Sequence, residues 1–181
     1  MMMMMIFTFF YRKYGSPLKP YTFEVVTLWY RSPELLLGSR IYNTSIDIWS
    51  IGCIFAEMLT GDPLFPGDGE IDQINKIFKV LGVPNEEKWP NYSKLPYANK
   101  INWRLPIKSK LRDLFPIGVS FSGGICLSEL GLDLLNKLLC MDPKQRITAA
   151  DALQHPWLKN ELPKPTDSDK MPTFKSRTDD E

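Results

Sequence analysis

Residues 44–60, TSIDIWSIGCIFAEMLT, decide the fold of this chain. Their apolar side chains fall on nearly every face of a helix, a pattern typical of a helix that is buried on all sides. Thr44 and Asp47, three residues apart, resemble a capping box at the start of that helix. Gly61 supplies a left-handed stop, and Pro63 follows it. The stretch therefore predicts a central buried helix over 44–60.

A second helix is predicted over 70–81, where apolar residues form a single stripe. Asp68 is the expected N-cap of this helix, because a short polar side chain there can accept from the first free backbone N–H groups. Gly82 and Pro84 end the pattern. One buried face is expected for this helix.

Two more helices are predicted in the last third of the chain. One covers 128–140 with its leucines facing inward. The other begins at Thr148, again with an acidic residue three positions on, Asp151, and is stopped or kinked at Pro156.

The connecting segments carry few regular patterns. Residues 12–44 are punctuated by glycine and proline, and only 23–30, FEVVTLWY, form a compact β-prone run. Residues 83–127 are long and without periodicity, which in a compact domain usually indicates function or disorder. The fold class predicted from these patterns is mostly α.

Composition excludes several classes of function. The 22 basic and 21 acidic residues give a net charge of +1, which provides no electrostatic footprint for nucleic acid or an anionic membrane. Cys53, Cys126 and Cys140 form no CxxC pair, which favours free thiols in an intracellular, reducing compartment. The single histidine, His155, excludes most zinc sites and catalytic triads, so we interpret it as a packed residue.

The two ends differ in composition from the middle. Residues 1–11, MMMMMIFTFFY, are apolar but too short to span a bilayer as a helix. We interpret them as a translated stub, with a membrane anchor as the alternative. Residues 160–181 are rich in Pro, Lys, Asp, Ser and Thr and are expected to form an extended tail. The predicted domain is 12–159.

Four motifs, in order along the chain, resemble those of the protein kinase large lobe. They are WYRSPE at 29–34, DIWSIGC at 47–53, DPKQRIT at 142–148 and HPW at 155–157. The first is similar to the Ala-Pro-Glu end of the activation segment, with Ser32 in place of alanine. The resemblance implies the C-terminal part of a kinase large lobe, from the activation segment to the last helix.

Longer stretches are similar to cyclin-dependent kinases. These are VVTLWYRSPELLLG at 25–38 and GDGEIDQINKIFKVLGVPNEEKWP at 67–90. YGSPLKPYT at 14–22 and KPTDSDKMPTF at 164–174 resemble the PITSLRE type, and FPIGVSFSGG at 115–124 resembles its plant members. The resemblance implies a proline-directed Ser/Thr protein kinase.

The resemblance also implies a phosphorylation site. Thr22 matches the activating phosphosite, and Arg12 matches one of the arginines that bind its phosphate. The alternative for Thr22 is an ordinary loop threonine.

Val25, Val26 and Thr27 match the pocket that receives the substrate residue after the target Ser or Thr, which is proline in this family. The alternative interpretation of this stretch is a short core strand.

Three further residues match structural positions of the family. Glu34 and Arg146 match a buried ion pair that joins the activation segment to the last helices. Asp47 matches the residue that holds the catalytic loop, but this chain has no such loop, so we interpret it as a helix N-terminal carboxylate that interacts with the helix dipole.

The 181 residues contain no glycine-rich phosphate loop, no VAIK-type lysine, no HRD catalytic loop and no DFG metal-binding aspartate. The resemblance therefore gives this chain no catalytic and no metal-binding residue, and predicts an inactive fragment although the family uses ATP and Mg²⁺. Two alternatives remain: a pseudokinase-like docking module, or an incomplete gene model of an active kinase.

The resemblance implies partners and a location as well. A cyclin, small regulatory or scaffold proteins that dock around 67–87, and protein substrates with Ser/Thr-Pro sites are the expected partners. No nucleic acid or membrane partner is expected. The expected location is intracellular, in the nucleus or the cytoplasm.

Overall fold

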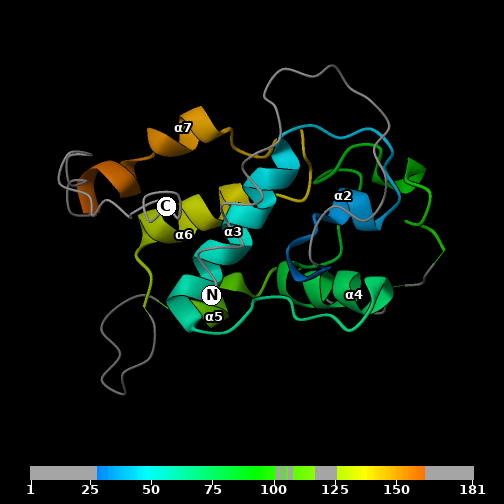
Figure 1. Ribbon diagram of the computed structural model, residues 1–181, viewed down its shortest axis with the longest axis horizontal. Coiled ribbons are helices and arrows are strands. Elements are labelled where there is room, and N and C mark those ends of the chain that lie inside the picture. The colour runs from blue at the N-terminus through cyan, green and yellow to red at the C-terminus, as the bar shows by residue number, and fades with distance from the viewer. Residues whose placement is uncertain (1–27, 101–102, 104, 106–107, 117–125, 162–181) are drawn as a thin grey trace, which may run out of the picture.

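A computed structural model describes residues 28–161 except 101–102, 104, 106–107 and 117–125. Within these ranges the chain is mostly helical and contains no β-strand, which confirms the predicted fold class (Figure 1). The α-helices are α2 (Pro33–Leu36), α3 (Ser45–Thr60), α4 (Glu70–Leu81), α5 (Leu111–Leu114), α6 (Glu129–Leu138) and α7 (Ala149–Leu153). The other helical elements are the 3₁₀ turns η1 (Leu28–Tyr30) and η2 (Tyr92–Lys94) and the π-helical turn η3 (Trp157–Glu161).

Helix α3 lies at the centre and crosses α6 at a glycine (Figure 1). A Cβ atom on Gly52 would lie 2.8 Å from Cδ2 of Leu139 and 3.0 Å from Cβ of Leu138, so only glycine permits this close approach. Trp49 and Cys53 of α3 are fully buried in the main core. The central position predicted for this helix is thus observed.

Helix α3 is central, but its apolar faces are not all covered by the described helices. Ile51 is 39% exposed and Met58 is 74% exposed, while Ile54 between them is only partly buried. These three residues follow the spacing of one helix face. The described helices cover the opposite side of α3 and leave this apolar stripe, Ile51–Ile54–Met58, in contact with solvent.

The start of α7 follows its predicted cap. The Thr148 hydroxyl accepts from the backbone N–H of Asp151 at 3.1 Å, and the Ser128 hydroxyl does the same for Gly131 at 3.0 Å at the start of α6. Each bond satisfies one of the N–H groups that a helix start leaves free.

Two other predicted caps are wrong. Thr44 makes no side-chain cap at α3; the Asn43 carboxamide oxygen instead accepts from the Ser45 N–H at 2.9 Å. The N-cap of α4 is Gly69 rather than Asp68, whose own N–H donates to Asp72 Oδ2 at 3.1 Å. In both places the side chain of a nearby residue, Asn43 or Asp72, accepts the local backbone hydrogen bond.

The β-prone run at 23–30 does not form a strand in its described part, because Leu28–Tyr30 adopt a 3₁₀ turn. Residues 23–27 lie outside the described ranges, as do the predicted stub 1–11 and nearly all of the tail. No helix in the described part of the chain is long and apolar enough to cross a bilayer.

Candidate functional site

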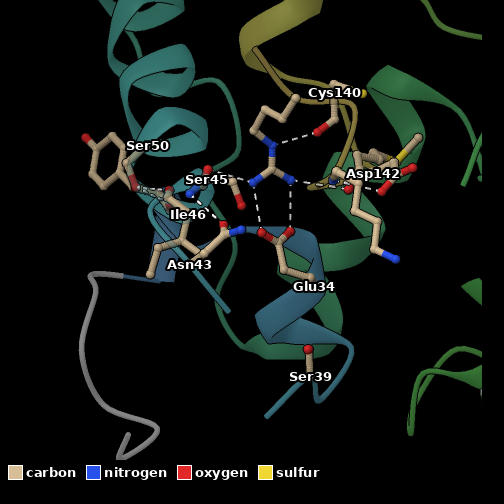
Figure 2. Close-up of polar contacts among 12 residues, drawn as sticks. Glu34, Ser39, Asn43, Ser45, Ile46, Ser50, Cys140 and Asp142 are labelled. Carbon is tan, nitrogen blue, oxygen red and sulfur yellow. Dashed lines mark hydrogen bonds and ion pairs between the residues drawn. The ribbon is translucent and has the colours of Figure 1, made fainter. Parts of the chain in front are cut away.

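The centre of the candidate site is a buried ion pair between Glu34 of α2 and Arg146 (Figure 2). Arg146 Nη1 lies 2.8 Å from Glu34 Oε1, and Nη2 lies 2.9 Å from Oε2, so the contact is bidentate. The side chains are 0% and 3% exposed. This geometry is the strong form of a carboxylate–guanidinium contact, because two parallel charge-assisted bonds share one plane.

The remaining donors of the Arg146 guanidinium are also used. Nε donates to the Cys140 carbonyl at 2.8 Å, Nη1 to the Ser45 carbonyl at 2.7 Å, and Nη2 to the Met141 carbonyl at 3.2 Å. All five N–H groups therefore have acceptors, as burial of a charge requires. One side chain joins α2, the first residue of α3 and the turn after α6.

A turn at Asp142 leads into Arg146 and holds its backbone in place for the ion pair. The Asp142 carboxylate accepts from the Lys144 N–H at 3.0 Å and from the Gln145 carboxamide at 2.8 Å. The backbone carbonyl of Asp142 accepts from the backbone N–H of Arg146 at 3.0 Å. These bonds fix the backbone immediately before the arginine, and Asp142 itself is buried.

The turn η1, which precedes α2, is attached to α3. The Tyr30 hydroxyl donates to Glu57 Oε2 at 2.6 Å, and the Tyr30 carbonyl accepts from the Ser50 hydroxyl at 3.0 Å. Burial, reinforced by the Glu57 carboxylate, raises the pKa of Tyr30 far above its usual value, so the phenol remains a donor at any physiological pH.

Helix α4 holds the other side of this segment. Arg31 Nη1 lies 2.7 Å from Glu70 Oε1, and the arginine side chain is only 13% exposed. The backbone from Leu28 to Glu34 is thus fastened to α3, to α4 and, through Glu34, to the turn that carries Arg146. We call this anchored segment, Leu28–Glu34, the seat.

Five predicted site residues lie outside the described ranges: Arg12, Thr22, Val25, Val26 and Thr27. Asp47 lies in the first turn of α3, half-buried, and burial raises the pKa of its carboxyl. In the described ranges no group of three or more His, Cys, Asp or Glu side chains is placed to hold a metal ion.

Glu34 and Arg146, which the sequence led us to pair, are in contact. The partners of η1 were not foreseen: Tyr30 with Glu57, and Arg31 with Glu70. Their separations of 27 and 39 residues follow no local rule, so only the arrangement of the helices brings them together. The one local signal for the Tyr30–Glu57 pair is that both residues stand among apolar neighbours in the sequence.

Comparison with known protein families places the chain in a specific group. The family description "Protein kinase domain" matches residues 10–158. That range contains the whole seat, Leu28–Glu34, and its partner Arg146.

Individual relatives agree. The chain is 58% identical over 163 residues to cyclin-dependent kinase G-1 of Oryza sativa subsp. indica, and 54% identical to cyclin-dependent kinase G1 of Arabidopsis thaliana. It is 50% identical over 168 residues to cyclin-dependent kinase 11B of Homo sapiens. These alignments cover 90–93% of this chain but only 20–26% of the relatives' own length, so the chain corresponds to about a quarter of each relative or less.

Proposed function

Because the chain belongs to the protein kinase family, we propose that it forms the substrate-facing part of the large lobe of a proline-directed Ser/Thr kinase of the cyclin-dependent type. The observation that carries the proposal is the rigid seat of Leu28–Glu34. The pocket residues Val25, Val26 and Thr27 directly precede that seat. Anchoring on two helices and through a buried ion pair supports a role in presenting the pocket at a defined place.

The pocket composition suits a proline side chain. Two valines offer an apolar surface with few accessible rotamers, so little conformational entropy is lost when they meet the ring. The alternative, a short core strand, requires a pairing partner for these residues, and the described part of the chain contains no strand.

Phosphoryl transfer itself needs other residues. Catalysis of this reaction consists mainly of positioning ATP and Mg²⁺ and of supplying a base, and these 181 residues contain none of the motifs that do so. We therefore expect a polypeptide of these residues alone to recognise substrate without transferring phosphate. If the full-length protein includes those motifs, it is an active kinase.

Thr22 is the proposed regulatory phosphosite. A phosphate there adds nearly two negative charges, which Arg12 is placed in sequence to meet. With one candidate arginine, we expect phosphorylation to change the protease sensitivity of residues 12–30 only slightly. Strong protection by the phosphate would mean that further cations complete the site.

A second candidate function is a docking module for regulatory proteins. In the first turn of α4, Ile71 is 67% exposed, and Tyr97 in the following segment is 39% exposed. Large apolar side chains that are exposed in a domain can mark partner sites. The proposed partners are a cyclin and small regulatory or scaffold proteins, and the proposed location is the nucleus or the cytoplasm.

Peptide binding tests the proposed function. A fluorescent peptide with a central Ser-Pro and its Ser-Ala counterpart are titrated with the purified chain, and binding is followed by fluorescence anisotropy. The proposal predicts measurable affinity for the Ser-Pro peptide and at least tenfold weaker affinity for the Ser-Ala peptide. Equal affinities, or no binding of either, would contradict it and would leave the docking module as the better account.

A further inference from the structure

A closed ring of three hydrogen bonds joins Trp29, Gly67 and Gln73. The Trp29 indole Nε1 donates to the Gly67 carbonyl at 2.9 Å. The Gly67 N–H donates to Gln73 Oε1 at 2.9 Å, and Gln73 Nε2 donates to the Trp29 carbonyl at 3.2 Å. Each residue comes from a different segment: η1, the loop before α4, and α4 itself.

Two of the three residues of the ring are buried, whereas Trp29 is 39% exposed. Gln73 is 0% exposed, and Gly67 is buried. An unpaired carboxamide in this position would be costly, because both its donor and its acceptor would lose water without compensation. Gln73 interrupts an otherwise apolar buried face of α4, so its bonds rather than its packing account for its presence.

Only one pair of residue types fits this geometry. A Cβ atom at position 67 would collide with Gln73 Oε1 and would lie 2.6 Å from Gln73 Cα, so the loop approaches α4 too closely for any side chain. A carboxamide offers an acceptor to the Gly67 N–H and a donor to the Trp29 carbonyl at the same time. Glutamate of the same shape would offer only acceptors when ionised.

Gln73 bonds to the backbone of Trp29, which is two residues after Thr27, the last residue of the proposed pocket. At the end of η1 the Arg31 N–H donates to the Leu28 carbonyl at 3.1 Å, and so short a 3₁₀ turn holds little shape by itself. The contacts of Tyr30 fix its α3 side. On the side of η1 that faces α4, buried Gln73 donates a hydrogen bond to the Trp29 carbonyl.

We propose that Gln73 is a positioning residue for substrate recognition: through the Trp29 carbonyl it sets the backbone that leads into the pocket Val25–Thr27. This inference rests on the proposed function for its link to substrate. Gln73 touches no substrate in this account. It acts through Trp29, and Gly67 completes the arrangement by holding the indole of the same residue.

The test compares Gln73→Glu with two matched controls. Gln73→Glu keeps the shape and the acceptor for Gly67, but turns an oxygen toward the Trp29 carbonyl. Gln154→Glu makes the same chemical change at an exposed position. Ile48→Val lowers stability in a separate apolar cluster between α3 and α6, away from the ring. Gln73→Leu serves as a second variant, which removes both bonds without introducing a charge.

Two readouts are taken on the full chain labelled with 5-fluorotryptophan. The first is the ¹⁹F resonance of Trp29, assigned with Trp29→Phe. The second is the affinity for the Ser-Pro peptide. We expect both Gln73 variants to shift or broaden the Trp29 resonance and to lower the affinity for the Ser-Pro peptide at least tenfold. The resonances of the other tryptophans, Trp49, Trp89, Trp103 and Trp157, should not change. Both controls should retain the wild-type resonance and affinity.

An unchanged Trp29 resonance in both variants would overturn the inference. So would an equal loss of peptide affinity in Ile48→Val, because the effect would then follow stability alone. If the wild-type chain binds no Ser-Pro peptide, the proposed function fails, and the substrate role given to Gln73 fails with it. The Trp29 resonance separates these cases, since it reports on Gln73 whether or not peptide binds.

Discussion

Arg146 and Glu34 are 112 residues apart in sequence and form a bidentate, fully buried ion pair. The pair joins α2 to the turn after α6 and, through the Ser45 carbonyl, to the start of α3. Three segments of the chain thus meet on one guanidinium. The seat proposed to present the substrate pocket depends on this contact, because Glu34 is its last residue.

Removing one partner of this pair is expected to be severely destabilising. Arg146→Met leaves the Glu34 carboxylate buried without a counter-charge, which typically costs roughly 3–5 kcal/mol. Chemical denaturation measures the change. Glu129→Gln breaks the exposed ion pair with Arg112 and is the matched control, with an expected loss below about 1 kcal/mol. Similar losses in both variants would mean that the buried pair has no special structural role.

Ser32 carries a buried hydroxyl without a partner. The residue is 1% exposed, and its Oγ makes no hydrogen bond. Ser32→Ala removes that unsatisfied group and should raise the free energy of unfolding by about 1 kcal/mol. Ser128→Ala removes a hydroxyl that caps α6 and should lower it by about 1 kcal/mol. Serine to alanine is therefore expected to raise the free energy of unfolding at position 32 and to lower it at position 128. A lower free energy of unfolding for Ser32→Ala would contradict the prediction.

The exposed stripe of α3, Ile51–Ile54–Met58, is expected to make the isolated chain self-associate and bind the dye ANS. Met58→Lys places a charge at the most exposed residue of this stripe and should reduce both self-association and ANS fluorescence severalfold. Leu153→Lys changes a side chain of similar exposure, 68%, on α7 and should leave them unchanged. Size-exclusion chromatography and ANS fluorescence provide the measurements. A monomeric wild-type chain without ANS binding would show that the stripe is covered.

Local signals predicted the main helices well. The apolar periodicity and the glycine stop placed α3 and α4 within a residue of their observed bounds, and the Thr148 hydroxyl caps α7 as expected. Such features depend on neighbours within four residues, so they can be read from the chain itself.

Apart from the two helix caps, the features that failed depend on distant contacts. Whether Met58 is covered is decided by which helices pack on α3, and its own sequence contains no such information. Leu28–Tyr30 have strand-like composition but form a turn, because their polar backbone groups bond to Ser50 and Gln73 instead of to another strand. Gln73 itself appeared only as a polar residue within an apolar stripe.

These residues are proposed to form substrate-facing structure and to bind no ATP by themselves. Titrating Mg·ATP while following thermal unfolding tests this proposal most directly. A binding site would stabilise the folded chain by about 2.7 kcal/mol at a hundredfold excess of ligand over Kd, which corresponds to a rise of several degrees. The account predicts no change in the unfolding temperature at any Mg·ATP concentration. A saturable rise would contradict it.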